Sequence, residues 1–462
     1  MHPLNSLLLP GRRADMSFPV SKSLLLIVMI ACFAGRAGGQ GEAMSLSDCI
    51  GYAYDHHPDI QVAQLQIRDA EWQIKESKAI GLPQFSAGIG YQYFLQRPGI
   101  PASALGFPGD EKLAFSPFHS LTPSLSYNQL FFSNSYRLAL KGSMYYRDYV
   151  YQQLAVTKSM VRNNVTDAYL PALLISENMG IISKNIGNLE KLLGDTKAIN
   201  EAGFAEQLDV DRIELSLATL RTERDNLERQ REVVVNALKL VMGMPVTESI
   251  DLSDDLTQLL GAYADADLGA EVNFMNRPEY VQLLRGRDLS ALDVELNSKT
   301  WMPSINGFIE YQPGWQGGFG NKSDANFKKW YFIPSAIAGI SVTVPIWDGG
   351  SSKARRERAI IGVQTIDIQK KTLENAITLE VENARKLLLN ARERVQSQQK
   401  NLDLAQRIYD TTQKKYKAGI GSSFEITQAE QQLYNAQQLL IQAQYDLLTA
   451  REALRKALGG NQ

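Results

Sequence analysis

The last helical segment of the chain carries one continuous apolar stripe. From residue 425 to 458 no Pro or Gly interrupts the sequence, and large and small apolar residues alternate at steps of three and four. That spacing is typical of a helix packed in a coiled coil. Some seventy helix-favouring residues and a glycine turn at Gly419 precede it, which predicts a long helical hairpin. The stripe comprises Ile426, Ala429, Leu433, Ala436, Leu440, Ala443, Leu447, Ala450, Leu454 and Ala457.

The same unit occurs a second time, 216 residues upstream. That step carries Gly419 to Gly203 and Pro345 to Gln129, with no insertion between them, and eight of the ten positions that correspond to the stripe are apolar. Self-similarity over nearly 200 residues indicates one architecture built twice rather than unrelated domains.

Each copy also contains one very long helix. In the first copy it should run from Asn134 to Ala202, 69 residues, or about 105 Å at 1.5 Å per residue. Pro171 predicts a kink or break of this helix near residues 167 to 171. A helix from Met44 to Leu82, which Pro83 ends, and a returning helix over 208–242 together match its length. Each copy is therefore expected to be a rod with strands at one end and a glycine turn at the other.

Four segments alternate apolar and polar residues, the period of a strand with two different faces. Their length of about ten residues suits a tilted transmembrane strand. Each hairpin loop is expected to exceed 20 residues, and aromatic residues crowd the strand ends as in an interfacial girdle, with several in or beside the second loop. A small soluble sheet covered by the helices is the alternative. The predicted strands cover about residues 84–94, 120–131, 304–312 and 336–346.

The first residues of the chain have the pattern of a secretory signal peptide. Basic residues precede an apolar run from Leu24 to Ala34 that is too short to span a bilayer, and small residues follow it. We expect a signal peptide over residues 1–39, beginning at Met1 or Met16; a lipoprotein site at Cys32 is the alternative. Because no later segment has about 18 consecutive apolar residues, strands must make any membrane crossing.

Composition excludes several classes of protein. The charge is nearly balanced, with 48 basic and 50 acidic residues, which does not suggest a nucleic-acid binder. No His or Cys set has metal-ligand spacing, and His56 and His57 more plausibly flank or cap a kink at Pro58 than bind a metal. Neither a nucleophile elbow nor a phosphate-binding loop occurs. We therefore predict no catalytic residue, no cofactor and no metal, and we expect the protein not to be an enzyme.

Four strands cannot close a barrel in lipid, where open edges are not tolerated. Two chains would give eight strands and a filled interior, whereas three give twelve and leave a lumen. The polar faces of the predicted strands favour a watery interior. The expected fold is mainly α with a membrane β-barrel: long coiled-coil hairpins and four strands per chain, assembled as a homotrimer with a 12-stranded barrel and a helical tunnel.

In these features the chain resembles the TolC family of outer-membrane efflux channels. The matching features are the twofold repeat, the strand entries Leu82-Pro83 and Met302-Pro303, and the motif Pro345-Ile346-Trp347-Asp348-Gly349-Gly350 that leaves the last strand. The turns at Gly203 and Gly419 and the segment Leu433-Tyr434-Asn435-Ala436-Gln437 also match. The resemblance covers about residues 44 to 460. It divides the mature chain into a first repeat over 44–243, a connecting equatorial segment over 244–265 and a second repeat over 266–460.

The resemblance implies a channel in the outer membrane with a long periplasmic extension. Its partners would be outer-membrane lipid, a periplasmic adaptor protein that meets the helical tips, and an inner-membrane transporter. The predicted adaptor-facing tip residues are Gly203, Phe204, Ala205, Gly419, Ile420, Gly421 and Ser422. In such channels the tip end closes at rest, and acidic side chains often line the constriction.

Candidates for the constriction follow from the same resemblance. Glu425 falls at one acidic position, and Gln428 stands where a second acidic residue would be expected, which departs from the family pattern. Asp209 and Asp211 occupy comparable places in the first copy. Acidic residues in a first helical turn can also simply complement the helix dipole, and this remains open for Asp209 and Glu425.

The predicted function is that of a passive exit duct in a tripartite efflux pump or a type I secretion system. A coiled-coil spacer protein of the cell envelope, without a pore, is the alternative. Four alternating segments ending in aromatic residues favour the channel, since a spacer rod has no use for them.

Overall fold

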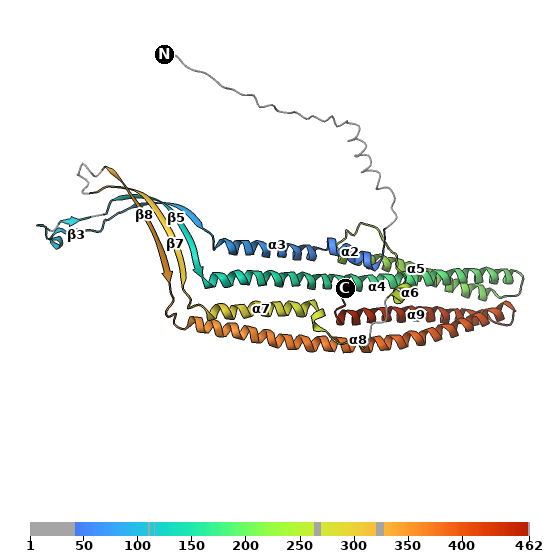
Figure 1. Cartoon of the computed structure of the whole chain (residues 1–462). Helices are drawn as coiled ribbons and strands as arrows, with labels where there is room; N and C mark the ends of the chain where they lie inside the picture. The colour runs from blue at the N-terminus through green and yellow to red at the C-terminus, as the bar shows by residue number, and fades with distance from the viewer. Residues whose placement is uncertain (1–41, 110, 115, 263–268, 320–327, 461–462) are drawn as a thin grey trace, which may run out of the picture.

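The computed structural model describes residues 42–109, 111–114, 116–262, 269–319 and 328–460. The expected signal peptide over 1–39 and the alternative lipid site at Cys32 lie outside these residues. Strands gather at one end of an elongated molecule, and long helices extend from them to the other end (Figure 1). No described helix combines the length and the apolarity needed to cross a membrane.

The helices form two antiparallel hairpins with shorter helices beside them. Helix α4 pairs with α5 and α8 pairs with α9, while α3 and α7 extend alongside α4 and α8 toward the strands (Figure 1). The α-helices are α2 (Leu46–His56), α3 (Pro58–Ala79), α4 (Asn134–Glu201), α5 (Gln207–Met242), α6 (Leu256–Ala262), α7 (Pro278–Ser298), α8 (Ser351–Lys417) and α9 (Ser423–Ala457). Two 3-10 turns, η1 (Ala102–Leu105) and η2 (Phe274–Asn276), also occur.

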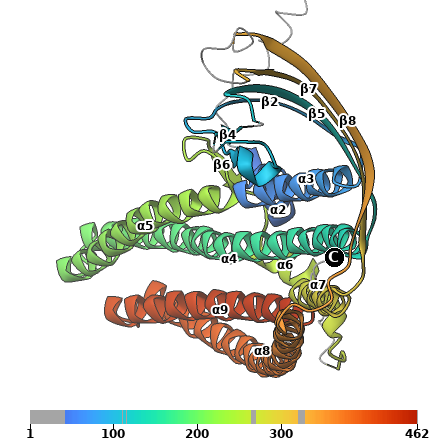
Figure 2. The same ribbon diagram turned by 90° about the vertical axis from the view of Figure 1, so that its left-hand side faces the viewer.

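The main sheet has four antiparallel strands in the order β2-β5-β7-β8 and is strongly curved (Figure 2). Its outer strands are β2 and β8, so each has a hydrogen-bonded neighbour on one side within this sheet. The strands are β2 (Gln84–Tyr93), β5 (His119–Ser133), β7 (Ser304–Gly317) and β8 (Trp330–Thr343). Two small pairs join β1 (Glu42–Met44) to β6 (Ile250–Leu252) and β3 (Ile100–Pro101) to β4 (Lys112–Leu113).

The strands of the second hairpin run further than the alternation predicts. Strands β7 and β8 each have 14 residues and include Trp315 and Trp330–Phe332, which were expected in or beside a loop. The connection therefore spans residues 318–329, and the prediction of more than 20 residues is wrong for this hairpin. Pro313 faces Pro334 across the pair, so two residues that cannot donate a backbone hydrogen bond are placed opposite each other.

The predicted break in the first long helix is also wrong. Helix α4 continues through Pro171 for 68 residues. Proline removes one backbone hydrogen bond and crowds the preceding turn. The neighbours of Pro171 are buried in the hydrophobic core near the middle of the molecule, where Tyr169, Leu170, Ala172 and Leu173 pack with Cys49 and Met242. This packing offsets the local cost and keeps the helix continuous through the proline.

In the helix preceding β2, by contrast, a proline does divide the chain. Residues Met44 to Leu82 were expected as one helical pattern, but α2 ends at His56 and α3 begins at Pro58. His57 caps α3, accepting a hydrogen bond from the Asp59 amide on its Nδ1 at 3.1 Å. The capping interpretation of the histidine pair is therefore confirmed. Among the described residues no cluster of three or more His, Cys, Asp or Glu side chains could hold a metal ion.

Candidate functional site: the helical tips

Each hairpin turns on a glycine with a positive φ. Gly203 has φ of 80° and Gly419 has φ of 73°, a backbone region that residues with a Cβ rarely adopt. At the first turn the Phe204 amide donates to the Ile199 carbonyl at 3.0 Å. At the second, the Ile420 amide donates to the Lys415 carbonyl at 3.1 Å. Both turns thereby satisfy carbonyls at the helix end.

The two tips expose apolar side chains. Phe204 is 87% exposed and Ile420 is 78% exposed. Ala205 supports the first turn because its carbonyl accepts a hydrogen bond from Asn200 Nδ2 at 2.8 Å. Ser422 caps α9 by accepting from the Glu425 amide at 3.2 Å. Hydrogen bonds thus hold both exposed tips to the helices beside them.

Gly421 is needed for a different reason from Gly203 and Gly419. Its φ is not positive, but a Cβ added there would lie 3.1 Å from the Tyr416 backbone nitrogen. This close approach lets the chain turn back directly onto the end of α8. Glycine thus permits a positive φ at Gly203 and Gly419, and at Gly421 its missing side chain permits close backbone packing.

The four candidate constriction residues divide into two groups. Asp209 is half-buried at the contact between the hairpins, where it accepts a hydrogen bond from the Ser423 hydroxyl, and it also accepts from the Glu206 amide at 3.3 Å. Asp211, Glu425 and Gln428 are exposed. Asp211 accepts from Gln207 Nε2 at 2.8 Å on its own helix. The structure therefore gives Asp209 a role in capping α5 and joining the hairpins.

Several polar contacts tie the hairpins together near the tips. Asn185 on α4 donates to Gln437 on α9 at 2.8 Å, and the hydroxyls of Thr196 and Tyr416 lie 2.9 Å apart. Nearer the turns, Lys417 lies 3.7 Å from Asp195. These contacts surround one hydrophobic cluster to which all four helices contribute, including Ile186, Ile213, Tyr409 and Leu433.

The sequence analysis missed one buried acidic residue in this cluster. Glu430 on α9 is 5% exposed, and burial raises the pKa of its carboxyl to about 8. It lies next to Ala429 of the apolar stripe, in the row formed by Ile426, Glu430 and Tyr434 at steps of four. All three of these side chains are buried. The steps of four that lead from Ile426 of the stripe to Glu430 and Tyr434 were the available signal.

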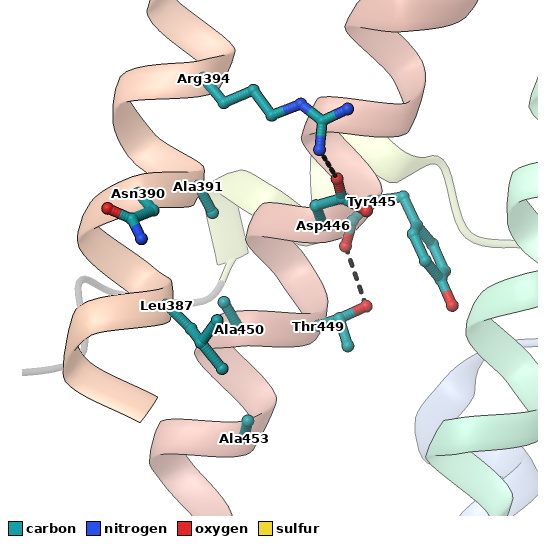
Figure 3. A pocket seen from close by; sticks show the side chains of 9 residues that line it. All are labelled: Leu387, Asn390, Ala391, Arg394, Tyr445, Asp446, Thr449, Ala450 and Ala453. Atoms are coloured by element: carbon teal, nitrogen blue, oxygen red, sulfur yellow. Dashed lines mark hydrogen bonds and ion pairs between the residues drawn. The ribbon is translucent and has the colours of Figure 1, made fainter. Parts of the chain in front are cut away.

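A second concave feature lies between α8 and α9, away from the tips. A cavity of about 330 Å³ lies there. Figure 3 shows the side chains that line it, among them Leu387, Ala391 and Ala450. Arg394 and Asp446, its two charged residues, pair with each other at 2.7 Å. The Thr449 hydroxyl donates to the Tyr445 carbonyl at 3.0 Å. Because these polar groups are satisfied internally, the cavity offers little specific recognition and does not define the site.

Comparison with known proteins identifies the class to which this arrangement belongs. Residues 276–460 match the family described as "Outer membrane efflux protein". The second half of the chain thus matches the outer membrane efflux protein family. The predicted resemblance is thereby confirmed, and with it the location in the outer membrane. The members of this family are outer-membrane efflux channels, which are not enzymes.

Individual relatives cover nearly the whole chain. The "Pyoverdine export outer membrane protein OpmQ" of Pseudomonas aeruginosa is 24% identical over 427 residues, which is 90% of this chain and 85% of the relative. The "Toluene efflux pump outer membrane protein TtgF" of Pseudomonas putida is 22% identical over 424 residues, which is 90% of this chain and 83% of the relative.

Solved structures show the same fold for this efflux protein. The open-state MtrE outer membrane channel of Neisseria gonorrhoeae superposes with a TM-score of 0.69 at 16% identity, covering 90% of this chain and 88% of that one. The outer membrane protein VceC of Vibrio cholerae superposes with a TM-score of 0.65 at 16% identity, covering 90% of this chain and 96% of that one. The TolC-like fold class expected from the sequence is confirmed.

Proposed function

We propose that this efflux protein is the passive exit duct of a tripartite efflux pump or a type I secretion system. Three chains would pair their sheets edge to edge into a 12-stranded barrel, and their hairpins would continue the lumen as a periplasmic tunnel. An inner-membrane transporter would supply the energy, and a periplasmic adaptor would contact the tips. The proposal includes the sequence-based division into a signal peptide (1–39), two repeats and the connecting segment 244–265.

The exposed, open-edged sheet is the observation that carries this proposal. Nearly all residues of β2 and β8 are exposed, including Phe85, Ile89 and Ile340. Unpaired strand edges and large exposed apolar surfaces are unfavourable in water. Pairing of β2 with β8 of another chain would satisfy the edges, and lipid would cover the apolar face. Three chains give twelve strands, enough to leave a lumen.

The tips supply the proposed interface with the adaptor. Phe204 and Ile420 present apolar side chains next to Ala205, Gly421 and Ser422, at the end of the rod opposite the sheet. Exposed aromatic and aliphatic residues on rigid turns are typical anchors of protein interfaces. Glu425, Gln428 and Asp211 remain the proposed constriction residues because they are exposed, whereas we assign Asp209 chiefly to the contact between hairpins.

The first test is the native mass of the mature protein extracted from outer membranes in mild detergent and corrected for bound detergent. We expect a mass of three chains and, after reconstitution into planar bilayers, a stepwise ion conductance. A monomer or dimer would overturn the shared barrel. A trimer without conductance would instead favour a closed or purely structural assembly.

A further inference from the structure

The carboxyl of Glu430 lies in the interior of the tip bundle without a counter-charge. It is 5% exposed, and among the described residues neither of its oxygens has a hydrogen-bond partner. Its burial arises within a single chain, because α4, α5, α8 and α9 all contribute to the surrounding cluster. Assembly with other chains is therefore not needed to create this environment.

A cavity of about 210 Å³ adjoins Glu430 at the contact between the hairpins. Leu189 of α4 contributes to its wall. On α5 the hydroxyls of Ser216 and Thr219 line it, and both donate to carbonyls of their own helix. Since no Lys or Arg lines this cavity, the side chains there offer no positive charge to stabilise a carboxylate.

The titratable groups of the surrounding helices named below supply no free positive charge to balance an ionised Glu430. Tyr409 of α8 has its pKa raised to about 12, first by burial and then by the carboxylates of Glu430 and Asp410. Tyr434 of α9 has its pKa raised to about 12 by burial and by Glu223 of α5. On α4, Glu190 next to Leu189 pairs with Arg221 of α5 at 2.7 Å. Both tyrosines remain neutral at physiological pH and cannot balance an ionised Glu430.

We propose that Glu430 is a proton-binding site that holds α9 against the first hairpin. With the proton bound, the neutral carboxyl remains in the interior, and the four-helix cluster stays closed. When the proton leaves, the carboxylate requires water, and the cavity beside it provides the route by which water enters. The contact of α9 with α4 and α5 then loosens at the tip.

The direction of the pH dependence follows from linkage. In the closed bundle the pKa of Glu430 is raised to about 8, whereas a hydrated glutamate has the ordinary value of 4.5. The closed state therefore binds more protons than the open state between these two values. The stability that the bound proton gives the closed state is fully present below pH 4.5 and is lost as the pH rises to 8. Local opening should increase up to about tenfold per pH unit in this window and level off above it.

Hydrogen exchange of the full-length protein in detergent provides the test. Exchange of amides around residues 426–440 is measured between pH 5.5 and 8.5 and corrected for the intrinsic pH dependence. In the wild type we expect opening to rise with pH. Glu430→Gln, which mimics the protonated carboxyl, should keep opening low and independent of pH. Glu232→Gln, which neutralises an exposed acid on α5, should behave as the wild type does.

Infrared difference spectra test the site even if the Gln variant folds poorly. Between pH 6.5 and 9 ordinary carboxyls are already ionised, so the wild type should lose a protonated-carboxyl band with a midpoint near 8. That band should be absent in Glu430→Gln and unchanged in Glu232→Gln. The proposal would be overturned if the carboxyl of Glu430 titrated at the ordinary glutamate value of 4.5. It would also be overturned if wild type and Glu430→Gln showed the same pH-dependent hydrogen exchange. Neither readout requires conduction, so the result is independent of the proposed channel function.

Discussion

Gly203 and Gly419 show how much of the tip depends on single residues. Both have positive φ, and a Cβ added at either would meet open space, so any penalty for replacing them comes from the backbone alone. An L-residue in the left-handed region costs about 1–2 kcal/mol. We expect Gly203→Val and Gly419→Val to distort the turns and to lower export without preventing membrane insertion.

Dye accumulation in cells that also carry the cognate transporter measures this effect, with immunoblots of outer membranes to verify insertion. Gly180→Val is a suitable control, because a Cβ there also meets open space but the backbone is helical. Normal export by both tip variants would remove the turns from the functional interface.

Glu425 lies on a different face of α9 from Glu430. The two residues are five positions apart, which places them about 140° apart around the helix axis. Glu425 is exposed, so its charge can act on ions near the tip. We expect Glu425→Ala to reduce cation selectivity and weaken block by multivalent cations in single-channel recordings. Glu232→Ala provides the matched control, and currents unchanged in Glu425→Ala would exclude this residue from the constriction.

At the scale of single elements, the sequence predicted helices better than strand ends. The glycine turns and the apolar stripe predicted the positions of both helical hairpins, because coiled-coil packing repeats along the whole length of a helix. Strand ends have no such repetition. Trp315 follows Pro313 and Gly314, and Trp330 follows two lysines, yet both belong to β7 and β8 because the neighbouring strands pair with them. Glu430 was missed because its burial depends on a second hairpin that lies far away in sequence.

Pro171 presents a related case, in which tertiary packing overrides a local signal. The proline cannot donate to the Asp167 carbonyl, yet α4 continues through it. Replacing it with Ala would restore this bond, and the residue is only half-buried, so the smaller side chain leaves little void. We expect Pro171→Ala to stabilise the protein by about 1–2 kcal/mol, since the cost of Pro in a helix exceeds its entropic benefit in the unfolded chain. Thermal unfolding in detergent measures the change, and a lowered midpoint would show that the proline is adapted to this core.

At the scale of the whole molecule, the two sheet edges determine how chains assemble. Strands β2 and β8 lie at opposite edges of the sheet, so β2 of one chain and β8 of the next would complete a closed ring in the proposed trimer. We expect a cysteine at Ile89 on β2 to form disulfides with cysteines at some positions along β8. The native Cys49 is buried and does not compete for these bonds.

Non-reducing gels should then show a ladder that ends at three chains. A cysteine pair at Leu125 and Tyr311, which are direct partners between β5 and β7, should cross-link within one chain and give no ladder. In a heterologous ring the number of chains follows from the rotation between neighbours, and a filament results when that rotation does not close. A ladder continuing beyond three would therefore contradict the trimer while keeping the edge pairing, whereas no ladder at any β8 position would contradict the pairing itself.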